Sequence, residues 1–292
     1  MLHEQLSSNP RLEVSGCQQM PDTIAVIIST YNKPDDLACV LEAYRFQTDK
    51  NFSIYVADDG STEETALLIK AIAKGFPVPV HHIWHEDRGF RLSEIRNRAL
   101  SAVSEPYVLI TDGDCIPLPA LVASHRNLCR QGSFLTGSRL LLNQRYSDII
   151  RKQKIDPGSL TSLRTLFSLR VKYAINRFWP ALIPSFTGRE SNKLGGLRGC
   201  HMSFWLKDLK TINGYDQSFT GWGREDSDIT ARLFHAGVKR RNLYGTPLLH
   251  LWHKEFSRDQ LHNNDAMLQA SLDERRIEAL CGLKQLEHHA DE

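Results

Sequence analysis

Three short polar clusters, each directly after an apolar run, are the parts of this sequence best able to carry chemistry. They are residues 29–32 (Ser-Thr-Tyr-Asn), 58–59 (Asp-Asp) and 112–114 (Asp-Gly-Asp). A single cluster of this kind says little, because turns favour the same residue types. If the three runs are strands of one parallel sheet, their ends meet at one edge, where open α/β sheets bind ligands. Three clusters together therefore favour a binding site over turns alone.

The third cluster has the ligand atoms that a hard divalent cation prefers. Asp112 and Asp114 supply carboxylates, and Gly113 permits a backbone tight enough to point both at one ion. Neither G-x-G-x-x-G nor G-x-x-x-x-G-K-[ST] occurs, so the common glycine-built phosphate cradles are absent from the sequence. Mn²⁺ or Mg²⁺ at this turn could neutralise a nucleotide diphosphate instead. Cys115 is expected to pack rather than bind this cation, because hard cations prefer oxygen.

A fourth cluster, at 221–228 (Gly-Trp-Gly-Arg-Glu-Asp-Ser-Asp), could supply the proton chemistry of a transfer reaction. Glu225 and Asp226 open an expected helix, whose N-terminal dipole favours ionised carboxylates. An ionised carboxylate can accept the proton of an acceptor hydroxyl as the new bond forms. Trp222 offers a flat apolar face to a sugar ring. The alternatives are an ordinary acidic first turn and a core tryptophan.

Two histidines late in the chain are candidate metal ligands. His250 and His253 lie at and just after the end of an expected strand. Their three-residue spacing does not by itself put both on one ion, and either could be an ordinary strand-end histidine. Three further histidines, His81, His82 and His85, are interpreted as strand-edge residues with no assigned role.

The elements that would position these clusters alternate between strand and helix over the first 115 residues. Continuous apolar runs predict strands buried on both faces at 23–29, 52–57, 80–84 and 107–111. Helical spacing predicts helices at 35–46, from 62 onward, and at 92–103. The alternation predicts an α/β fold with a doubly wound parallel sheet. The alternation of strands and helices resumes at residues 199–206. A helix at 226–236, a last strand at 246–252 and a polar helical tail follow.

A basic segment after residue 138 breaks this alternation. Residues 139–198 contain 12 Lys/Arg and 3 Asp/Glu, although the net charge of the whole chain is only +2. Apolar residues from Leu160 to Phe178 share one face of an expected helix. The segment is either a solvated helix that covers the cleft, or a surface for anionic lipid heads or an anionic glycan. In the second case Phe178 and Trp179 would enter the interface.

Composition is ordinary for a folded protein. The 292 residues are 41% apolar and 24% charged, and six cysteines without C-x-x-C or zinc-like spacing favour a reducing compartment. The start lacks a basic region followed by an apolar one, and no stretch approaches the roughly 18 apolar residues of a spanning helix. We therefore expect a cytoplasmic location, with peripheral contact at the inner face of a membrane.

Taken in order, these motifs resemble family 2 glycosyltransferases of the GT-A fold. The resemblance is carried by residues 27–32 (Ile-Ile-Ser-Thr-Tyr-Asn), 56–61 (Val-Ala-Asp-Asp-Gly-Ser), 96–97 (Arg-Asn) and 112–114. Residues 221–228 resemble the G-W-G-x-E-D signature of β-1,4-galactosyltransferases and of the N-acetylgalactosaminyltransferase domain of bacterial chondroitin polymerases. The resemblance covers residues 23–140 and 196–256, whereas the basic segment departs from it in length and charge.

This resemblance implies a Rossmann-like GT-A domain at 21–256 with a mostly parallel sheet flanked by helices. It would comprise a donor half at 21–115, a basic helical insertion at 139–195 and an acceptor half at 196–256, followed by a C-terminal helical tail at 257–292. The implied reaction is an inverting, metal-dependent transfer of a hexose or N-acetylhexosamine from a nucleotide diphosphate sugar, preferably a UDP-sugar. The implied acceptor is a glycan or lipid-linked saccharide in surface polysaccharide or lipopolysaccharide biosynthesis.

The resemblance also implies roles for individual residues. Those that would bind the sugar nucleotide are Ser29, Thr30, Asn32, Asp59, Arg96 and Asp112. Those that would bind Mn²⁺ or Mg²⁺ are Asp114, His253 and His250. Asp226 would be the catalytic base, with Glu225 beside it as a second catalytic and acceptor-binding residue, and Trp222 would also contact the acceptor. Arg96 could pair with Glu94 instead of the sugar nucleotide.

Two other functions remain open from the residues. A sugar-nucleotide nucleotidyltransferase would share the sheet and the cation, but it usually has a glycine-rich basic loop after the first strand, which residues 31–34 (Tyr-Asn-Lys-Pro) do not form. A non-catalytic glycan-binding domain would keep the fold, although Asp114, Asp226 and His253 argue against decay of the site. No nucleic-acid partner is expected.

Overall fold

The structure is a computed structural model that describes residues 20–153, 162–255 and 257–288. Its larger sheet contains the strands β1 (Ile24–Thr30), β2 (Phe52–Asp58), β3 (Val80–Trp84), β4 (Tyr107–Asp112), β6 (Ser133–Thr136), β8 (Phe186–Ser191), β9 (His201–Trp205) and β10 (Lys239–Tyr244). Its smaller sheet contains β5 (Cys115–Ile116), β7 (Arg139–Leu141) and β11 (Leu248–His250). The helices are α1 (Pro34–Tyr44), α2 (Glu63–Ala73), α3 (Leu92–Ala102), α4 (Leu121–Leu128), α5 (Gln144–Gln153), α6 (Leu163–Val171), α7 (Leu206–Thr211), α8 (Glu225–His235), α9 (Leu261–Asp273) and α10 (Leu283–His288), with a 3-10 turn, η2 (Trp179–Ala181).

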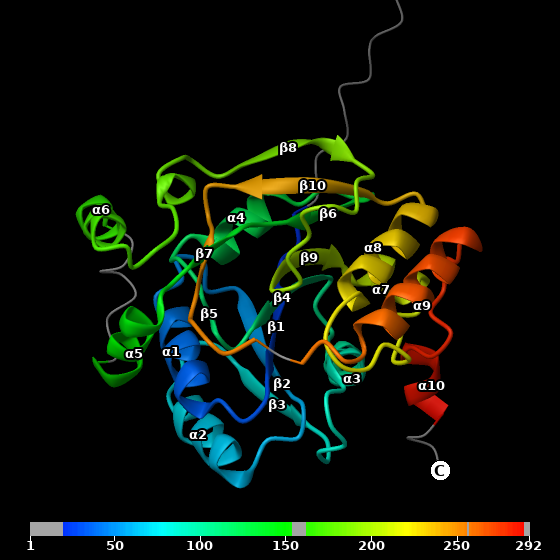
Figure 1. The fold of residues 1–292 in the computed structure, drawn as a ribbon, viewed down its shortest axis with the longest axis horizontal. Coiled ribbons are helices and arrows are strands. Elements are labelled where there is room, and N and C mark those ends of the chain that lie inside the picture. Colours follow the sequence, from blue (N-terminus) through cyan, green and yellow to red (C-terminus); the bar gives the residue numbers. More distant parts are fainter. Residues whose placement is uncertain (1–19, 154–161, 256, 289–292) are drawn as a thin grey trace, which may run out of the picture.

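The larger sheet has the strand order β3-β2-β1-β4-β9-β6-β10-β8, and helices lie on both of its faces (Figure 1). Strands β3, β2, β1 and β4 are parallel neighbours. Strand β9 runs antiparallel between β4 and β6, and β8 pairs antiparallel with β10 at the edge. This mostly parallel sheet with flanking helices confirms the predicted α/β class. Strands β6, β8 and β10 were not predicted.

Strand β1 is buried on both faces because its alternate side chains enter two different apolar layers. Ile24, Val26 and Ile28 belong to the layer that includes α1 and α2. Ala25 and Ile27 belong to the layer that includes α3 and α8. This two-sided burial explains why the run is continuously apolar instead of alternating with polar residues.

The register of the central strands brings the three polar clusters to one edge. Ile24 of β1 lies opposite Phe52 of β2, and the same pairing runs on to Thr30 opposite Asp58. On its other side β1 pairs Ser29 with Asp112 of β4. Because parallel strands that are in register end together, the expected edge site has the backbone geometry it requires.

The basic segment is only partly helical, which corrects the prediction of one helix to Phe178. Helix α6 ends at Val171, and Tyr173 then takes a left-handed backbone conformation (φ 53°) that a helix cannot continue. Ile175, a β-branched residue, instead forms a bridge with Leu142. The strand β8 follows, and Leu160 lies outside the described residues. The described part of the segment therefore adds two short helices, a 3-10 turn and two edge strands, β7 and β8, to the domain.

The C-terminal residues form the expected helices with a loop between them. Helix α9 packs against α8, and α10 packs against α3 (Figure 1). Leu283 at the start of α10 is buried in the same apolar layer as α3 and α8. Strand β9 leads directly into helix α7, which was not predicted. Within the described ranges, none of the helices combines the length and apolar character needed to cross a bilayer.

Candidate active site

The turn after β4 lies so close to β1 that it requires a glycine. The Gly113 N–H donates to the Ser29 carbonyl oxygen over 2.7 Å. A Cβ at Gly113 would lie 3.2 Å from that oxygen and from the Thr30 side chain. This close approach sets Asp112 and Asp114 against the end of β1. The expectation that both carboxylates point at one ion is corrected, because Asp112 pairs with Arg96 whereas Asp114 lies beside His250 and His253.

Asn32 ties the first two strand ends to each other. Its backbone N–H donates to Ser61 Oγ (2.8 Å), and its side-chain oxygen accepts from the Thr62 N–H (2.9 Å). Asn32 has a left-handed backbone (φ 47°), which asparagine tolerates better than most residues. In this structure Asn32 therefore positions the loops that follow β1 and β2.

Arg96 joins the strand-end clusters to the late acidic cluster. Its guanidinium is buried (1% exposed) and lies 3.1 Å from a carboxylate oxygen of Asp112 and 3.1 Å from one of Asp226. Its Nε donates to Ser29 Oγ over 3.1 Å. Glu94, the alternative partner, pairs with other arginines, as expected because residues two apart on a helix point in different directions. Two carboxylates 114 residues apart in the sequence thus share one buried cation.

Asp226 and Glu225 form the first turn of α8 and are held in a confined space. A Cβ at Gly199 would lie 1.7 Å from Asp226 Oδ2, so only glycine fits beside this carboxylate. Burial raises the pKa of Asp226, while Arg96 acts in the opposite direction. Burial, and then the charge of Asp226, raise the pKa of Glu225 to about 8. Glu225 Oε2 is buried and makes no hydrogen bond to any described residue.

Asp112 interacts electrostatically with both Asp114 and Asp226. Burial raises its pKa to about 6, Arg96 opposes the rise, and the charges of Asp114 and Asp226 add to it. Asp112 and Asp226 thus share Arg96 as an ion-pair partner. The charge of Asp114 also raises the pKa of Asp112. The proposed base and the proposed metal ligand therefore belong to one connected cluster.

The smaller sheet brings both late histidines to Asp114. Pairing of β11 with β5 sets His250 opposite Cys115, and the Leu251 N–H donates to the Asp114 carbonyl oxygen. His250 Nε2 lies 3.6 Å from Asp114 Oδ1, and His253 Nε2 lies 3.4 Å from Oδ2. The two nitrogens thus lie beside different oxygens of one carboxylate, and the ligand atoms that come within 4.8 Å of one another here are those of Asp114, Cys115 and His250, without His253.

The charges around Asp114 keep it ionised. Burial alone would raise its pKa, but interactions with His250 in its protonated form, with Lys33 and with His253 outweigh burial and lower it, and at pH 7 the charge of Lys33 remains. Lys33 Nζ lies 3.3 Å from Asp114 Oδ2. Burial lowers the pKa of His250 to about 4 although Asp114 opposes the shift, so its imidazole is neutral at pH 7 and able to coordinate a metal. An ionised carboxylate and a neutral imidazole are a suitable donor set for Mn²⁺ or Mg²⁺.

Two histidines with no role assigned from the sequence lie on the edge strand β3 or directly after it, as expected, and contact the second cluster. His82 Nε2 lies 2.9 Å from Asp58 Oδ2, and His85 Nε2 lies 2.8 Å from Asp59 Oδ1. The other Asp59 oxygen accepts from the Arg91 N–H (2.9 Å). The signal in the sequence was a histidine-rich strand that follows the strand ending in Asp-Asp, because consecutive parallel strands are commonly neighbours.

A family model described as "Glycosyl transferase family 2" matches residues 25–184, which is more than half of the chain. The chain belongs to glycosyltransferase family 2. A second model, described as "N-terminal domain of galactosyltransferase", matches residues 189–254 of this glycosyltransferase. The two matches together span the strand-end clusters, α8 and both late histidines.

Curated relatives of this glycosyltransferase include several enzymes of saccharide synthesis. Chondroitin synthase of Escherichia coli is 28% identical over 80% of this chain and 35% of its own length. Hyaluronan synthase of Pasteurella multocida is 25% identical over 78% of this chain and 24% of its own. Validoxylamine A glucosyltransferase of Streptomyces hygroscopicus subsp. jinggangensis is 25% identical over 74% and 52%. The chain thus spans between about a quarter and a half of the length of these relatives.

Solved structures share the fold. The mannosyltransferase PcManGT of Pyrobaculum calidifontis, in complex with GDP-Man and Mn²⁺, superposes with a TM-score of 0.55 at 16% identity, over 81% of this chain and 59% of that one. S. aureus TarS 1–349, in complex with UDP, gives 0.57 at 15% identity, over 92% and 72%. These likenesses confirm that this glycosyltransferase has the GT-A fold.

Trp222 lies in an exposed loop of this glycosyltransferase and is not a core residue. It is 40% exposed, and the guanidinium of Arg258 lies over its ring at 5.3 Å. The loop is held from α9, where Asn264 Nδ2 donates to the carbonyl oxygens of Thr220 and Gly223. An exposed aromatic ring on a fixed loop is available to a ligand.

Proposed function

We propose that this glycosyltransferase is an inverting, metal-dependent enzyme. It would transfer a hexose or N-acetylhexosamine from a UDP-sugar to a saccharide acceptor in surface polysaccharide or lipopolysaccharide biosynthesis. The observation that carries the proposal is the buried Arg96, which contacts Asp112 on the sugar-nucleotide side and Asp226 on the acceptor side. In a direct displacement the base and the leaving group act on opposite sides of one carbon. Asp226 and the sugar-nucleotide site must therefore lie close together, as their shared contact with Arg96 indicates.

The sugar nucleotide would bind at the strand ends. Ser29 and Thr30 would contact the base and ribose, Asp59 the uracil N–H, and Asp112 the ribose. Thr30 Oγ1 is buried and has no hydrogen bond to the described residues, so it is available to a ligand. His85 supports the carboxylate of Asp59 from behind. One structural neighbour is named as a complex with UDP and another as a complex with GDP-Man. The nucleobase of the sugar nucleotide is therefore to be identified by experiment.

Mn²⁺ or Mg²⁺ would be held by Asp114, His250 and His253. The ion would supply positive charge to the departing diphosphate. Lys33, 3.3 Å from Asp114, adds a second positive charge on the same side. The low pKa of Asp114 supports this assignment, since a ligand must be ionised to bind a cation.

Asp226 would accept the proton of the acceptor hydroxyl. The contact with Arg96 favours its ionised form, and Gly199 fixes its position. Glu225, with its pKa raised to about 8, is mostly protonated at pH 7 and would donate a hydrogen bond to an acceptor oxygen. Trp222 would stack on an acceptor sugar. The names of the chondroitin and hyaluronan synthases support a saccharide acceptor.

The same proposal divides the chain by task. Residues 21–115 would bind the sugar nucleotide, 196–256 would bind the acceptor, 139–195 would be an insertion, and 257–292 would be a supporting tail within the fold. Contacts of α9 with α8 and of α10 with α3 support the last assignment.

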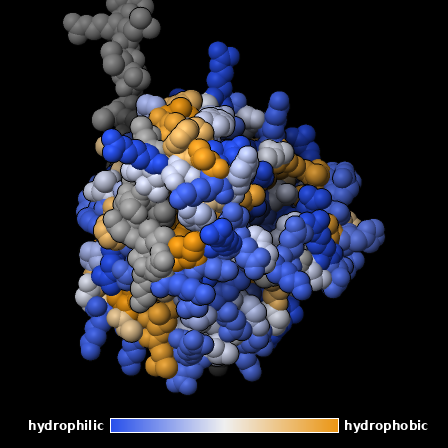
Figure 2. Space-filling view, turned by 60° about the vertical axis from the view of Figure 1, so that its left-hand side comes forward, coloured by the Kyte–Doolittle hydropathy of each residue, from blue (hydrophilic) through white to orange (hydrophobic). Residues whose placement is uncertain are grey.

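The insertion would contact the cytoplasmic face of a membrane with anionic lipids. Its exposed large apolar side chains among the described residues are Leu141, Phe167, Val171, Tyr173, Trp179, Leu182 and Phe186. Arg170, Lys172 and Arg177 lie among them in sequence, and Figure 2 shows apolar and polar side chains intermixed on the side of the molecule that carries α5 and α6. Basic and aromatic residues together suit a charged lipid interface. Co-sedimentation with phosphatidylglycerol vesicles but not with phosphatidylcholine vesicles is expected, and equal binding to both would contradict this contact.

Thermal shifts with nucleotide sugars test the proposed function. We expect UDP-sugars to raise the melting temperature only with Mn²⁺ or Mg²⁺, because the ion completes the diphosphate site. A ligand at about 100 times its Kd adds about 2.7 kcal/mol of stability. Asp114→Ala should remove the shift without lowering the melting temperature of the ligand-free protein by a comparable amount. A full shift in the presence of a chelator would overturn the metal assignment, and a retained anomeric configuration in the product would overturn inversion.

A further inference from the structure

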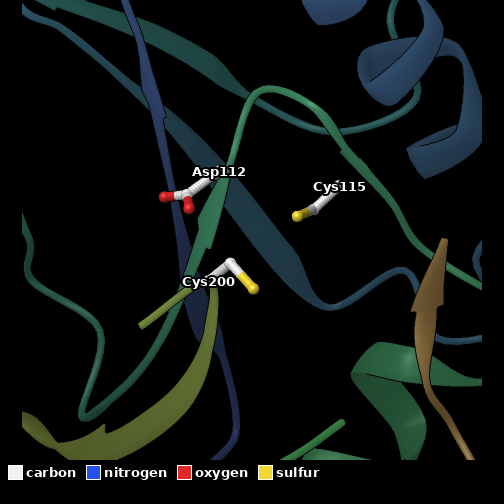
Figure 3. Close-up of side chains that lie close together, drawn as sticks. All are labelled: Asp112, Cys115 and Cys200. Atoms are coloured by element: carbon white, nitrogen blue, oxygen red, sulfur yellow. The ribbon is translucent and has the colours of Figure 1, made fainter. Parts of the chain in front are cut away.

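Two cysteine thiols face each other beside the Asp112-Gly113-Asp114 turn, and the proposed transfer reaction gives them no task (Figure 3). Cys115 follows the turn at the start of β5, and Cys200 directly precedes β9. Both are buried, at 0% and 2% exposed. Their sulfur atoms and a carboxylate oxygen of Asp112 all lie within 4.8 Å of one another. Three potential metal ligands from two distant parts of the sequence therefore converge.

Cys115 also belongs to a second convergence of ligand atoms. Its sulfur, a carboxylate oxygen of Asp114 and a ring nitrogen of His250 lie within 4.8 Å of one another. Its thiol donates to Asp114 Oδ1 over 3.5 Å. Cys115 is thus shared by two sets of ligand atoms, one completed by Asp114 and His250 and the other by Asp112 and Cys200.

The oxygen and sulfur atoms of these two sets suit different ions. Mn²⁺ and Mg²⁺ prefer oxygen ligands, whereas Zn²⁺ and Cd²⁺ bind thiolate sulfur readily and accept three protein ligands and one open position. Arg139 Nη1 lies 3.8 Å from Cys200 Sγ, which places a positive charge where a thiolate would form.

We propose that Asp112, Cys115 and Cys200 form a second cation site, selective for thiophilic ions of the Zn²⁺ class, next to the proposed Mn²⁺ or Mg²⁺ site. Each thiol that coordinates the ion releases its proton to solvent. Asp112 is at present bound to Arg96 (3.1 Å), so an ion that takes this carboxylate competes with Arg96 for it. Occupation of the site therefore inhibits transfer, and this part of the inference rests on the proposed function.

Optical titration of the whole chain with Cd²⁺ tests the site without reference to activity. With a phosphine reductant present, one equivalent of Cd²⁺ should produce a thiolate-to-metal charge-transfer absorption. Cys115→Ser and Cys200→Ser should each weaken Cd²⁺ binding by at least about tenfold. Cys129→Ser is the matched control: Cys129 is equally buried but lies at the end of α4, near Tyr107 at the other end of β4, and its loss should change nothing.

Inhibition by Zn²⁺ gives the second readout. Transfer by Cys200→Ser should need at least about ten times more Zn²⁺ for half-inhibition than transfer by the wild-type protein. Absence of the Cd²⁺ band in the wild type, or an equal loss in Cys129→Ser, would overturn the site. If Cys200→Ser fails to fold by its melting curve, Cys115→Ala provides the same comparison. A Cd²⁺ band in a protein that transfers no sugar would contradict the proposed function and leave the thiol site standing.

Discussion

Two clusters of polar side chains each include a residue of β4, Asp112 in one and Tyr107 in the other, but they differ in how fully their members are paired. In the active-site cluster, Arg96 contacts Asp112 and Asp226, and Glu225 keeps an oxygen without a hydrogen bond to the described residues. A second cluster, the histidine cluster, consists of Tyr107, His125, His201 and Ser203. It carries no charge and its hydrogen bonds form a continuous chain.

The chain of the histidine cluster has one consistent direction. The Tyr107 hydroxyl donates to Ser203, which donates to His125 Nδ1, and His125 Nε2–H donates to His201 Nε2. His201 Nδ1–H then donates to the Ser138 carbonyl oxygen. This direction is the one that two neutral imidazoles allow. Burial lowers the pKa of His125 and lowers that of His201 to about 4.

This difference separates a cluster that stabilises the fold from one that can react. A buried polar group without a partner costs free energy, and a ligand that pairs with it recovers that cost. The active-site cluster has such a group in Glu225, whereas the histidine cluster has paired every ring nitrogen. Substitution in the first should therefore change activity, and substitution in the second should change stability.

The largest expected effect is on the transfer rate of Asp226→Asn. The amide keeps the shape of the side chain but cannot accept the proton of the acceptor, so the rate should fall by about 10²- to 10⁴-fold. Sugar-nucleotide binding should persist, because the residues proposed to contact it are unchanged. Single-turnover transfer and the thermal shift with the UDP-sugar measure the two parts. A near-normal rate would remove Asp226 as the base.

A smaller effect is expected on acid stability from the histidine cluster. Between the unfolded pKa near 6.5 and the folded value of about 4, the unfolded state binds more protons, so stability falls as the pH falls through this window. For His201 alone the loss is about 3 kcal/mol once the pH is below about 4. Protonation would also put two hydrogens between His125 and His201.

Urea unfolding between pH 7 and pH 4 measures this loss, with His201→Gln as the comparison. The variant is less stable at pH 7, since it disrupts the chain of hydrogen bonds, but its stability should depend less steeply on pH. Equal slopes for the wild type and the variant would contradict the assignment of a neutral histidine pair.

A stability effect of similar size is expected for Glu225→Gln. The folded pKa of about 8 lies above the ordinary value of 4.5, so the folded state binds more protons, and the contribution of Glu225 to stability is lost as the pH rises through 8. Glutamine resembles the protonated form at every pH. The variant should gain on the wild type between pH 5 and pH 8.5 by about 4 kcal/mol, measured from urea unfolding at the two pH values. A constant difference would show that Glu225 is ionised throughout.

The sequence was most informative where local pattern and strand register agree. Continuous runs such as that of β1 predicted the central strands, and parallel strands that end together brought Ser29 and Asp112 to one edge. The family and the GT-A fold are confirmed, whereas the individual roles of Asp226 and His253 stay predictions. Motifs of fixed order carried these inferences because each lies at a strand end or at the start of a helix.

Local sequence patterns could not predict contacts between elements that are distant in the sequence. Arg96 meets Asp226 across 130 residues, and His85 meets Asp59 only because β3 lies beside β2 in a particular register. The end of α6 at Val171 depends on the left-handed backbone of Tyr173 and on the bridge between Ile175 and Leu142. Helical spacing continues through these residues, so periodicity alone could not find the break.

The tight fit of Gly199 against Asp226 offers a way to inactivate the protein without altering a single ionisable group. One methyl group at position 199 has no room beside the carboxylate and must push it away from Arg96. Every ionisable group of the site would remain, so if Asp226 is the base as proposed, an alanine there should slow transfer while the residues proposed to bind the sugar nucleotide are kept. Such a protein is a suitable starting point for trapping a ternary complex.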